Sequence, residues 1–239
     1  MTATAATFQA SVSDKPIIRI QAISGLVFAV FLVLHLANMC AALFGQAAYD
    51  GFMSAMRWYY QSPLVELSAV LGAATVHMGA AVVRISQRRA RAKSKTNASW
   101  RVRLHRYSGY YIMAAFFGHV IATRVPGLLG HPADFSFVNF SLTYAGVFFY
   151  PYYFLFALSG LYHLTHGTVV ALRIVGARLP KWMTAPRSRA FWTWTVACSL
   201  MALFGVLAIG GQLYSPDQAR FEEWKQFAGD YVPESLQPW

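Results

Sequence analysis

The stretch Arg19–His35, RIQAISGLVFAVFLVLH, decides the fold because a second stretch, Arg103–His119 (RLHRYSGYYIMAAFFGH), follows the same plan. In each, Ser-Gly begins five residues after the arginine, and a histidine follows 16 residues after it. The second copy lies 84 residues after the first at every matched position. A histidine ring in hydrocarbon costs free energy unless it is paired or binds something. The repeat therefore predicts matched histidine sites inside a membrane bundle.

The composition is that of an integral membrane protein. Hydrophobic residues make up 56% of the 239 positions and charged residues 12%, and the mean hydropathy is +0.40. A helix needs roughly 20 apolar residues to cross a hydrocarbon core of about 30 Å. Five stretches are long enough: about 17–44, 63–85, 104–125, 143–172 and 190–213. We therefore predict an all-α integral membrane fold with five transmembrane helices, the first four forming the bundle.

The chain divides into three parts. Residues 1–16 form a polar N-terminal segment, residues 17–213 form the membrane domain, and residues 214–239 form an acidic tail. The first apolar stretch is too long for the core of a signal peptide, so we expect it to be retained as a helix. Within the tail, Gln218 to Phe227 is expected to form a short amphipathic helix on the membrane surface.

The basic residues predict the orientation. Sixteen of the 20 Lys and Arg residues lie on one side of the predicted helices: Lys15, Arg19, Arg84, Arg88, Arg89, Arg91, Lys93, Lys95, Arg101, Arg103, Arg106, Arg173, Arg178, Lys181, Arg187 and Arg189. The positive-inside rule puts this side, with the N-terminus, in a bacterial cytoplasm or a mitochondrial matrix and the C-terminus outside. The basic residues are not interleaved with aromatic residues, so they indicate contact with anionic lipid or a docked protein and exclude nucleic acid.

Helical rise places the histidines at two depths. His35 and His119 each lie 16 residues beyond an arginine, about 24 Å from the inner boundary. His77 and His166 each begin an H-x6-R-I segment and lie about 10 Å from that boundary. They are expected to form an outer and an inner pair, each diagonal across a four-helix bundle, with levels about 14 Å apart. His163, at about 15 Å, is the alternative to His166.

Haem is the natural candidate for a cofactor with two axial ligands, and two pairs of histidines are expected to hold two haems that relay electrons across the bilayer. No C-x-x-C-H motif for covalent attachment is present, so any haem is of b type. Cys40 and Cys198 fall inside predicted helices, and we expect neither a disulfide nor an iron–sulfur cluster. The alternative is a haem-free membrane protein whose histidines bridge helices or bind protons or a metal.

At these residues the chain resembles the membrane-anchor cytochrome b of succinate:quinone oxidoreductases and quinol:fumarate reductases, the complex II family. The likeness is to its single-chain type with five helices and two haems b. The segment Leu104–Gly109, LHRYSG, matches the H-R-x-[ST]-G signature of such anchors. His163-x3-Gly167 fits the family's H-x3-G ligand motif, whereas His166-Gly167…Arg173 resembles the H-G…R form of some five-helix members.

The resemblance implies one axial histidine on each of the first four helices, pairing the first with the third and the second with the fourth. It implies that a flavoprotein subunit and an iron–sulfur subunit dock on the inner face and carry the dicarboxylate chemistry. This chain would bind quinone, menaquinone or ubiquinone, and pass electrons between it and the iron–sulfur subunit. A cytochrome b of another respiratory complex, such as a hydrogenase or formate dehydrogenase, is the alternative. The acidic tail departs from the family pattern.

Further candidate residues lie near the two membrane boundaries. Five at the inner boundary are candidates for hydrogen bonds to a quinone carbonyl or to haem propionates: Arg19, Ser24, His105, Arg106 and Ser108. Snorkelling and helix capping are the alternative roles. Glu66, at the outer start of the second helix, is a candidate acceptor of the proton released by a quinol. Its alternative role is that of an acidic residue favoured by the helix dipole.

Overall fold

The computed structural model describes residues 15–91, 98–185, 188–231 and 234–237, and over these residues the chain is helical without any strand. Five helical segments within these ranges are long and apolar enough to cross a membrane: Pro16–Phe44, Pro63–Gln87, Trp100–Leu128, Gly146–Ile174 and Arg189–Ile209. The predicted all-α membrane fold is therefore confirmed. Lys93, Lys95, Arg187 and nearly all of the predicted N-terminal segment lie outside the described residues.

The long segments are continuous helices with one irregular region. Their elements are α1 (Lys15–Ala41) with η2 (Ala42–Phe44), α3 (Pro63–Val65) with η3 (Glu66–Gly72) and α4 (Ala73–Arg91), then α5 (Trp100–Leu128), α7 (Gly146–Ile174) and α9 (Arg189–Ile209). The irregular region is η3, a π-helix. A Cβ at Gly72 would lie 2.6 Å from the Leu67 carbonyl oxygen, so this wider turn requires a residue without a side chain.

The connections are more ordered than the sequence patterns indicated. They contain α2 (Gln46–Tyr60), α6 (Phe135–Tyr144), α8 (Lys181–Thr184), α10 (Phe221–Tyr231) and η4 (Glu234–Leu236).

The expected end of the third span at residue 125 is too early, because α5 continues through Pro126 to Leu128. Proline is tolerated in this last turn because its missing N–H removes only one backbone hydrogen bond. Its carbonyl oxygen is satisfied, since it accepts from the backbone N–H of His131 at 2.8 Å. The expected tail helix exists but is shifted toward the C-terminus.

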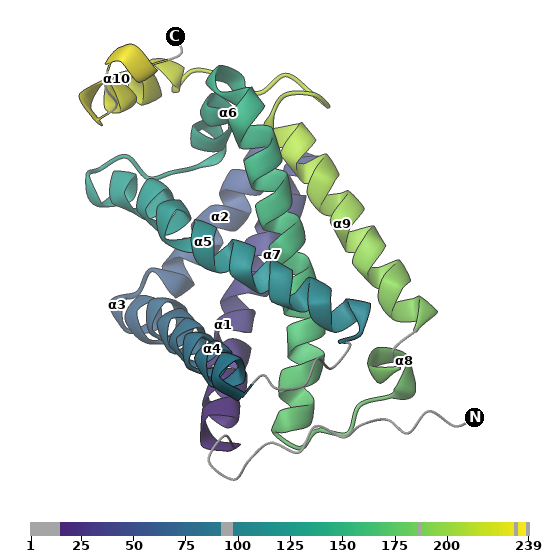
Figure 1. Cartoon of the computed structure of the whole chain (residues 1–239). Coiled ribbons are helices and arrows are strands. Elements are labelled where there is room, and N and C mark those ends of the chain that lie inside the picture. Colours follow the sequence, from purple (N-terminus) through teal and green to yellow (C-terminus); the bar gives the residue numbers. More distant parts are fainter. Residues whose placement is uncertain (1–14, 92–97, 186–187, 232–233, 238–239) are drawn as a thin grey trace.

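Among the described residues, two pairs of helices face each other across the bundle without packing closely: α1 faces α5, and α4 faces α7. Helix α1 packs against α4, α7 and α9, and α7 also packs against α5 and α9 (Figure 1). Small residues permit the α1–α9 contact: Ala202 is fully buried, and a Cβ at Gly205 would lie 2.7 Å from the Met39 carbonyl oxygen. In the described part of the chain, neither α1 with α5 nor α4 with α7 is among the closely packed pairs. These diagonals are the ones expected for the histidine pairs.

We call the end of the bundle that carries α8 the inner end and the end that carries α2, α6 and α10 the outer end (Figure 1). At the inner end, buried Arg101 donates to the Ala185 carbonyl at 2.7 Å, which ties the start of α5 to the connection between α8 and α9. At the outer end, Arg57 of α2 donates to the Ala133 carbonyl before α6. Buried polar contacts thus hold both ends of the bundle together.

Candidate functional site

Two pairs of imidazole rings face each other across the open diagonals. His35 of α1 and His119 of α5 have ring centres 5.9 Å apart and planes inclined by 75°. His77 of α4 and His163 of α7 have ring centres 6.0 Å apart and planes inclined by 89°. We refer to these as the outer pair and the inner pair. Within the described residues, no three His, Cys, Asp or Glu side chains form a group that could hold a metal ion by themselves.

The inner pair differs from the expected one. The sequence favoured His166 as the partner of His77, but the ring opposite His77 is that of His163. The His166 ring is buried elsewhere, stacked 6.1 Å from Tyr162 and edge-on to Phe191 at 6.3 Å. Residues three apart differ by about 60° around a helix axis, and the rotation of α7 in the bundle turns His163 toward His77.

The ring nitrogens of the inner pair are oriented by matched backbone contacts. His77 Nδ1 lies 2.8 Å from the Gln21 carbonyl oxygen, and His163 Nδ1 lies 3.3 Å from the His105 carbonyl oxygen. A carbonyl oxygen only accepts, so these two contacts correspond to the tautomer in which Nδ1 carries the proton; Ser108 Oγ also lies 3.4 Å from His163 Nδ1. Each Nε2 is left with a free lone pair, which is the form that binds a metal.

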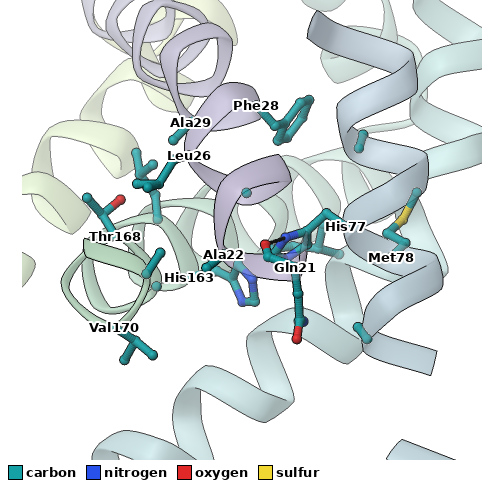
Figure 2. Close-up of a pocket in the computed structure, with 18 of the residues that line it drawn as sticks. Gln21, Ala22, Leu26, Phe28, Ala29, His77, Met78, His163, Thr168 and Val170 are labelled. Atoms are coloured by element: carbon teal, nitrogen blue, oxygen red, sulfur yellow. Dashed lines mark hydrogen bonds between the residues drawn. The ribbon is translucent and has the colours of Figure 1, made fainter. Parts of the chain in front are cut away.

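A cavity surrounds the inner pair. It contains about 1070 Å³ of space free of atoms, part of it open to the outside, and its walls come from α1, α4, α5 and α7. Figure 2 shows His77 and His163 reaching this cavity from different helices, with the hydrogen bond from His77 to Gln21 dashed. The walls are mostly apolar, with Gln21, Arg84, His105 and Thr168 among the polar residues. Its lining is that of a site for a mostly apolar ligand held by a few polar groups.

Comparison with known proteins identifies no relative. No family model, no curated protein and no solved structure matches this chain. The chemistry of the site is therefore argued from its own residues.

The two glycines of the repeat lie against the inner pair. A Cβ at Gly25 would lie 2.7 Å from His77 Nδ1, and a Cβ at Gly109 would lie 2.9 Å from His163 Cε1. Both distances are shorter than a Cβ atom tolerates, so the histidine rings occupy the space that a side chain would need. The repeat therefore bears on both histidine pairs: its histidines form the outer pair, and its glycines contact the inner one.

The five residues expected at the inner boundary do not form one cluster. Arg19 and Arg106 have exposed side chains. Ser24 and Ser108 are buried and donate to carbonyls of their own helices, Ser24 to Ile20 at 2.7 Å and Ser108 to His105 at 3.0 Å.

Of these five residues, His105 has the closest contact with the inner pair, because its ring stacks on His163 with centres 4.2 Å apart. On its other side lies His166, with ring centres 4.9 Å apart. Its Nδ1 is buried without a hydrogen-bond partner. His105 therefore separates the inner-pair histidine from the alternative one.

Glu66 is held in an ion pair. Arg124 of α5 donates to both carboxylate oxygens, from Nε at 2.5 Å and from a terminal nitrogen at 3.0 Å. Both side chains are partly buried, Glu66 at 17% and Arg124 at 29% exposure. Glu66 also begins the π-helix η3. Glu66 is therefore a paired carboxylate, and its partner is a contact that the sequence did not indicate.

Four residues of this arrangement were missed as functional from the sequence: Gln21, Gly25, Gly109 and Arg124. The two glycines had a usable signal, because both copies of the repeat carry Ser-Gly at the matched position. Gln21 had none, since its contribution to His77 is a backbone carbonyl, which every residue carries. Arg124 had none either, because its partner lies 58 residues away in the chain.

Proposed function

We propose that this chain is a di-haem cytochrome b that anchors a succinate dehydrogenase or fumarate reductase complex in the membrane. In this role it binds quinone and carries electrons between quinone and the iron–sulfur subunit. The observation that carries the haem proposal is the pair of facing imidazoles at each of two levels, with ring centres 5.9 and 6.0 Å apart.

The spacing of the rings fits axial ligation. Imidazole nitrogens bind metals at about 2 Å, so the centres of two axial rings on one metal lie about 6 Å apart. Two histidines are all that a b-type haem takes from the protein, because the porphyrin supplies the remaining four nitrogens. When bound, the haem supplies one-electron chemistry.

The surroundings of the inner pair also fit a haem. Backbone carbonyls accept from the Nδ1 atoms of His77 and His163, the usual second contact of a metal-binding histidine, and leave each Nε2 free as a ligand. The adjoining cavity has mostly apolar walls from four helices. The outer pair does not line this cavity and is supported by its ring geometry and its place in the repeat.

The quinone and partner assignments rest on the resemblance to the complex II anchors and on the basic residues at the inner end. Exposed basic side chains there, including Arg178, Lys181 and Arg189, offer a surface for a docked subunit. In this proposal the inner end faces a bacterial cytoplasm or a mitochondrial matrix. His163 takes the place of His166 as the inner ligand.

The test is the reduced-minus-oxidised spectrum of the purified chain, with haem quantified per chain. We expect two b haems per chain. A chain without haem, obtained from membranes of a haem-sufficient host, would instead support the haem-free alternative. Co-purification of a flavin-bearing subunit would distinguish the succinate or fumarate complex from a hydrogenase or formate dehydrogenase.

Single histidine variants test the ligand assignment. We expect His77→Ala and His163→Ala each to remove one haem and to leave the other, because each removes an axial nitrogen from the inner pair. His166→Ala is the matched control, since it removes a buried imidazole from the same helix and should leave both haems. Loss of a haem in His166→Ala but not in His163→Ala would instead make His166 the inner ligand, as the sequence favoured.

A further inference from the structure

The repeated segments supply the histidines of the outer pair and also the backbone carbonyls that contact the inner pair. Positions 21, 24 and 25 of the first copy correspond to positions 105, 108 and 109 of the second. In both copies, the carbonyl at the first position accepts from an inner-pair histidine. Ser108 also donates to that same carbonyl at 3.0 Å, whereas Ser24 Oγ lies 3.3 Å from the Gln21 carbonyl and donates at shorter distance, 2.7 Å, to Ile20.

The helix geometry explains why a glycine follows each serine. The Cβ of a helical residue tilts toward the N-terminus, so a side chain covers the turn that precedes it. A side chain at position 25 would therefore lie over the carbonyl of Gln21, four residues earlier. The same relation holds between position 109 and the carbonyl of His105. With glycine at both positions, each carbonyl is open to a donor from another helix.

The contact distances agree with this explanation. A Cβ at Gly25 would lie 2.7 and 2.8 Å from two atoms of the His77 ring, and a Cβ at Gly109 would lie 2.9 and 3.2 Å from two atoms of the His163 ring. Both glycines are contacted by the same side of the ring, Nδ1 and Cε1. The two sites thus form one arrangement, built twice on different helices.

We propose that Gly25 and Gly109 are positioning residues for the inner haem: each lets one axial imidazole reach a helix carbonyl, which orients that ring and directs its Nε2 across the bundle. The proposal rests on the proposed haem function. It adds that Ser24-Gly25 and Ser108-Gly109 serve the histidines of the neighbouring helices, α4 and α7, and not the histidine in their own copy.

The experiment compares glycine variants that differ only in what the added methyl group meets. Gly25→Ala and Gly109→Ala place a Cβ against the inner rings. Gly79→Ala and Gly118→Ala are matched controls in α4 and α5. Gly79 lies two residues after His77 and Gly118 directly before His119, and a Cβ at either position meets nothing within 4 Å. All four replace a helical glycine by alanine, so the change in helix propensity is shared.

The readouts are haem per chain and the electron paramagnetic resonance spectrum of the oxidised protein. The anisotropy of a low-spin bis-imidazole haem depends on the angle between its ring planes, which is 89° for the inner pair and 75° for the outer pair. His77→Ala and His35→Ala identify which signal belongs to which haem. We expect Gly25→Ala and Gly109→Ala to lose or shift the inner signal alone, with haem falling from two toward one per chain, and both controls to match the wild type.

Two further results distinguish a clash between the added methyl group and the inner-pair ring from a general disruption of the bundle. If a glycine variant loses both haems, the double variant Gly25→Ala/His77→Ala removes the ring that the methyl group meets and should regain the outer haem. Failure of that rescue, or glycine variants whose signals match those of the controls, overturns the positioning role while leaving the haem proposal in place. A wild-type chain without haem overturns both.

Discussion

Glu66 and Arg124 illustrate how a single tertiary contact changes the role expected of a residue. The ion pair joins the π-helix η3 to α5 near the outer end of the bundle, with both side chains partly buried. Removing one member leaves a poorly solvated charge without its partner. We therefore expect Glu66→Gln and Arg124→Gln each to lower the free energy of unfolding by about 1–3 kcal/mol.

The double variant Glu66→Gln/Arg124→Gln distinguishes an ion pair from a proton acceptor. It removes both charges, so most of the lost stability should return. If Glu66 serves mainly to bind Arg124, quinone-linked turnover of the assembled complex should return as well. A stable double variant that retains both haems and the dye-linked activity of the catalytic subunits, yet lacks quinone turnover, would assign proton transfer to Glu66. Thermal unfolding and quinone reduction assays measure the two effects.

At the scale of the element, α10 is a docked helix. Trp224 is 1% exposed and donates from Nε1 to Ser136 Oγ at 2.8 Å, and Phe221 packs against Phe140 of α6. Arg220 pairs with Asp134, which also caps the start of α6. The acidic tail is thus folded onto the outer end of the bundle.

The docking of α10 should depend on pH through Glu223. Hydrogen bonds from Arg220 and then His131 lower the pKa of the Glu223 carboxyl from its ordinary value of 4.5 to about 2. A lowered pKa in the docked state means that the carboxylate contributes to docking above about pH 4.5 and loses this contribution as the pH falls toward 2. We expect the protection of the α10 amides, measured as exchange relative to the intrinsic rate at each pH, to be constant above about pH 4.5 and to fall below it.

A matched pair of variants isolates this contribution. Glu223→Gln should accelerate exchange in α10 at neutral pH and flatten its dependence on acid. Glu222→Gln is the control, because the neighbouring carboxylate is largely exposed and pairs only within its own helix, with Lys225 at 2.7 Å. If the two substitutions have equal effects on exchange in α10, the Glu223 carboxylate does not stabilise the docking of α10.

At the scale of the whole molecule, charge is divided between the two ends. The exposed basic residues of the inner end include Arg173, Arg178, Lys181 and Arg189, whereas the acidic tail lies at the outer end. We expect the charge reversal Arg178→Glu/Lys181→Glu to release a flavin-bearing partner while both haems stay bound. The reason is that the docking surface, and not the bundle, loses its charge.

Deletion of residues 218–239 is the matched test at the opposite end. It exposes the α6 surface under α10 but leaves the inner end and the histidine pairs untouched, so haem content and partner association should remain. Co-purification from membranes followed by flavin and haem quantification measures both. Release of the partner by the deletion alone would place the docking surface at the outer end.

The spans, the histidine depths and the repeat follow from the sequence because they depend on local quantities. Helical rise is constant, and the thickness of hydrocarbon determines how many apolar residues a span needs. The all-α membrane fold was therefore predictable, whereas matching the histidines by depth selected His166, and the ring opposite His77 is that of His163. The diagonal arrangement of His35 with His119 also agrees with the structure.

Which of His163 and His166 lies opposite His77 was decided only by tertiary structure. The two residues lie about 60° apart around α7, and the rotation of that helix is set by its packing against α1, α5 and α9. The partner of Glu66 was decided in the same way, by a contact with Arg124 across 58 residues of sequence. Depth along a helix is a local property, whereas the direction that a side chain faces depends on every helix packed around it.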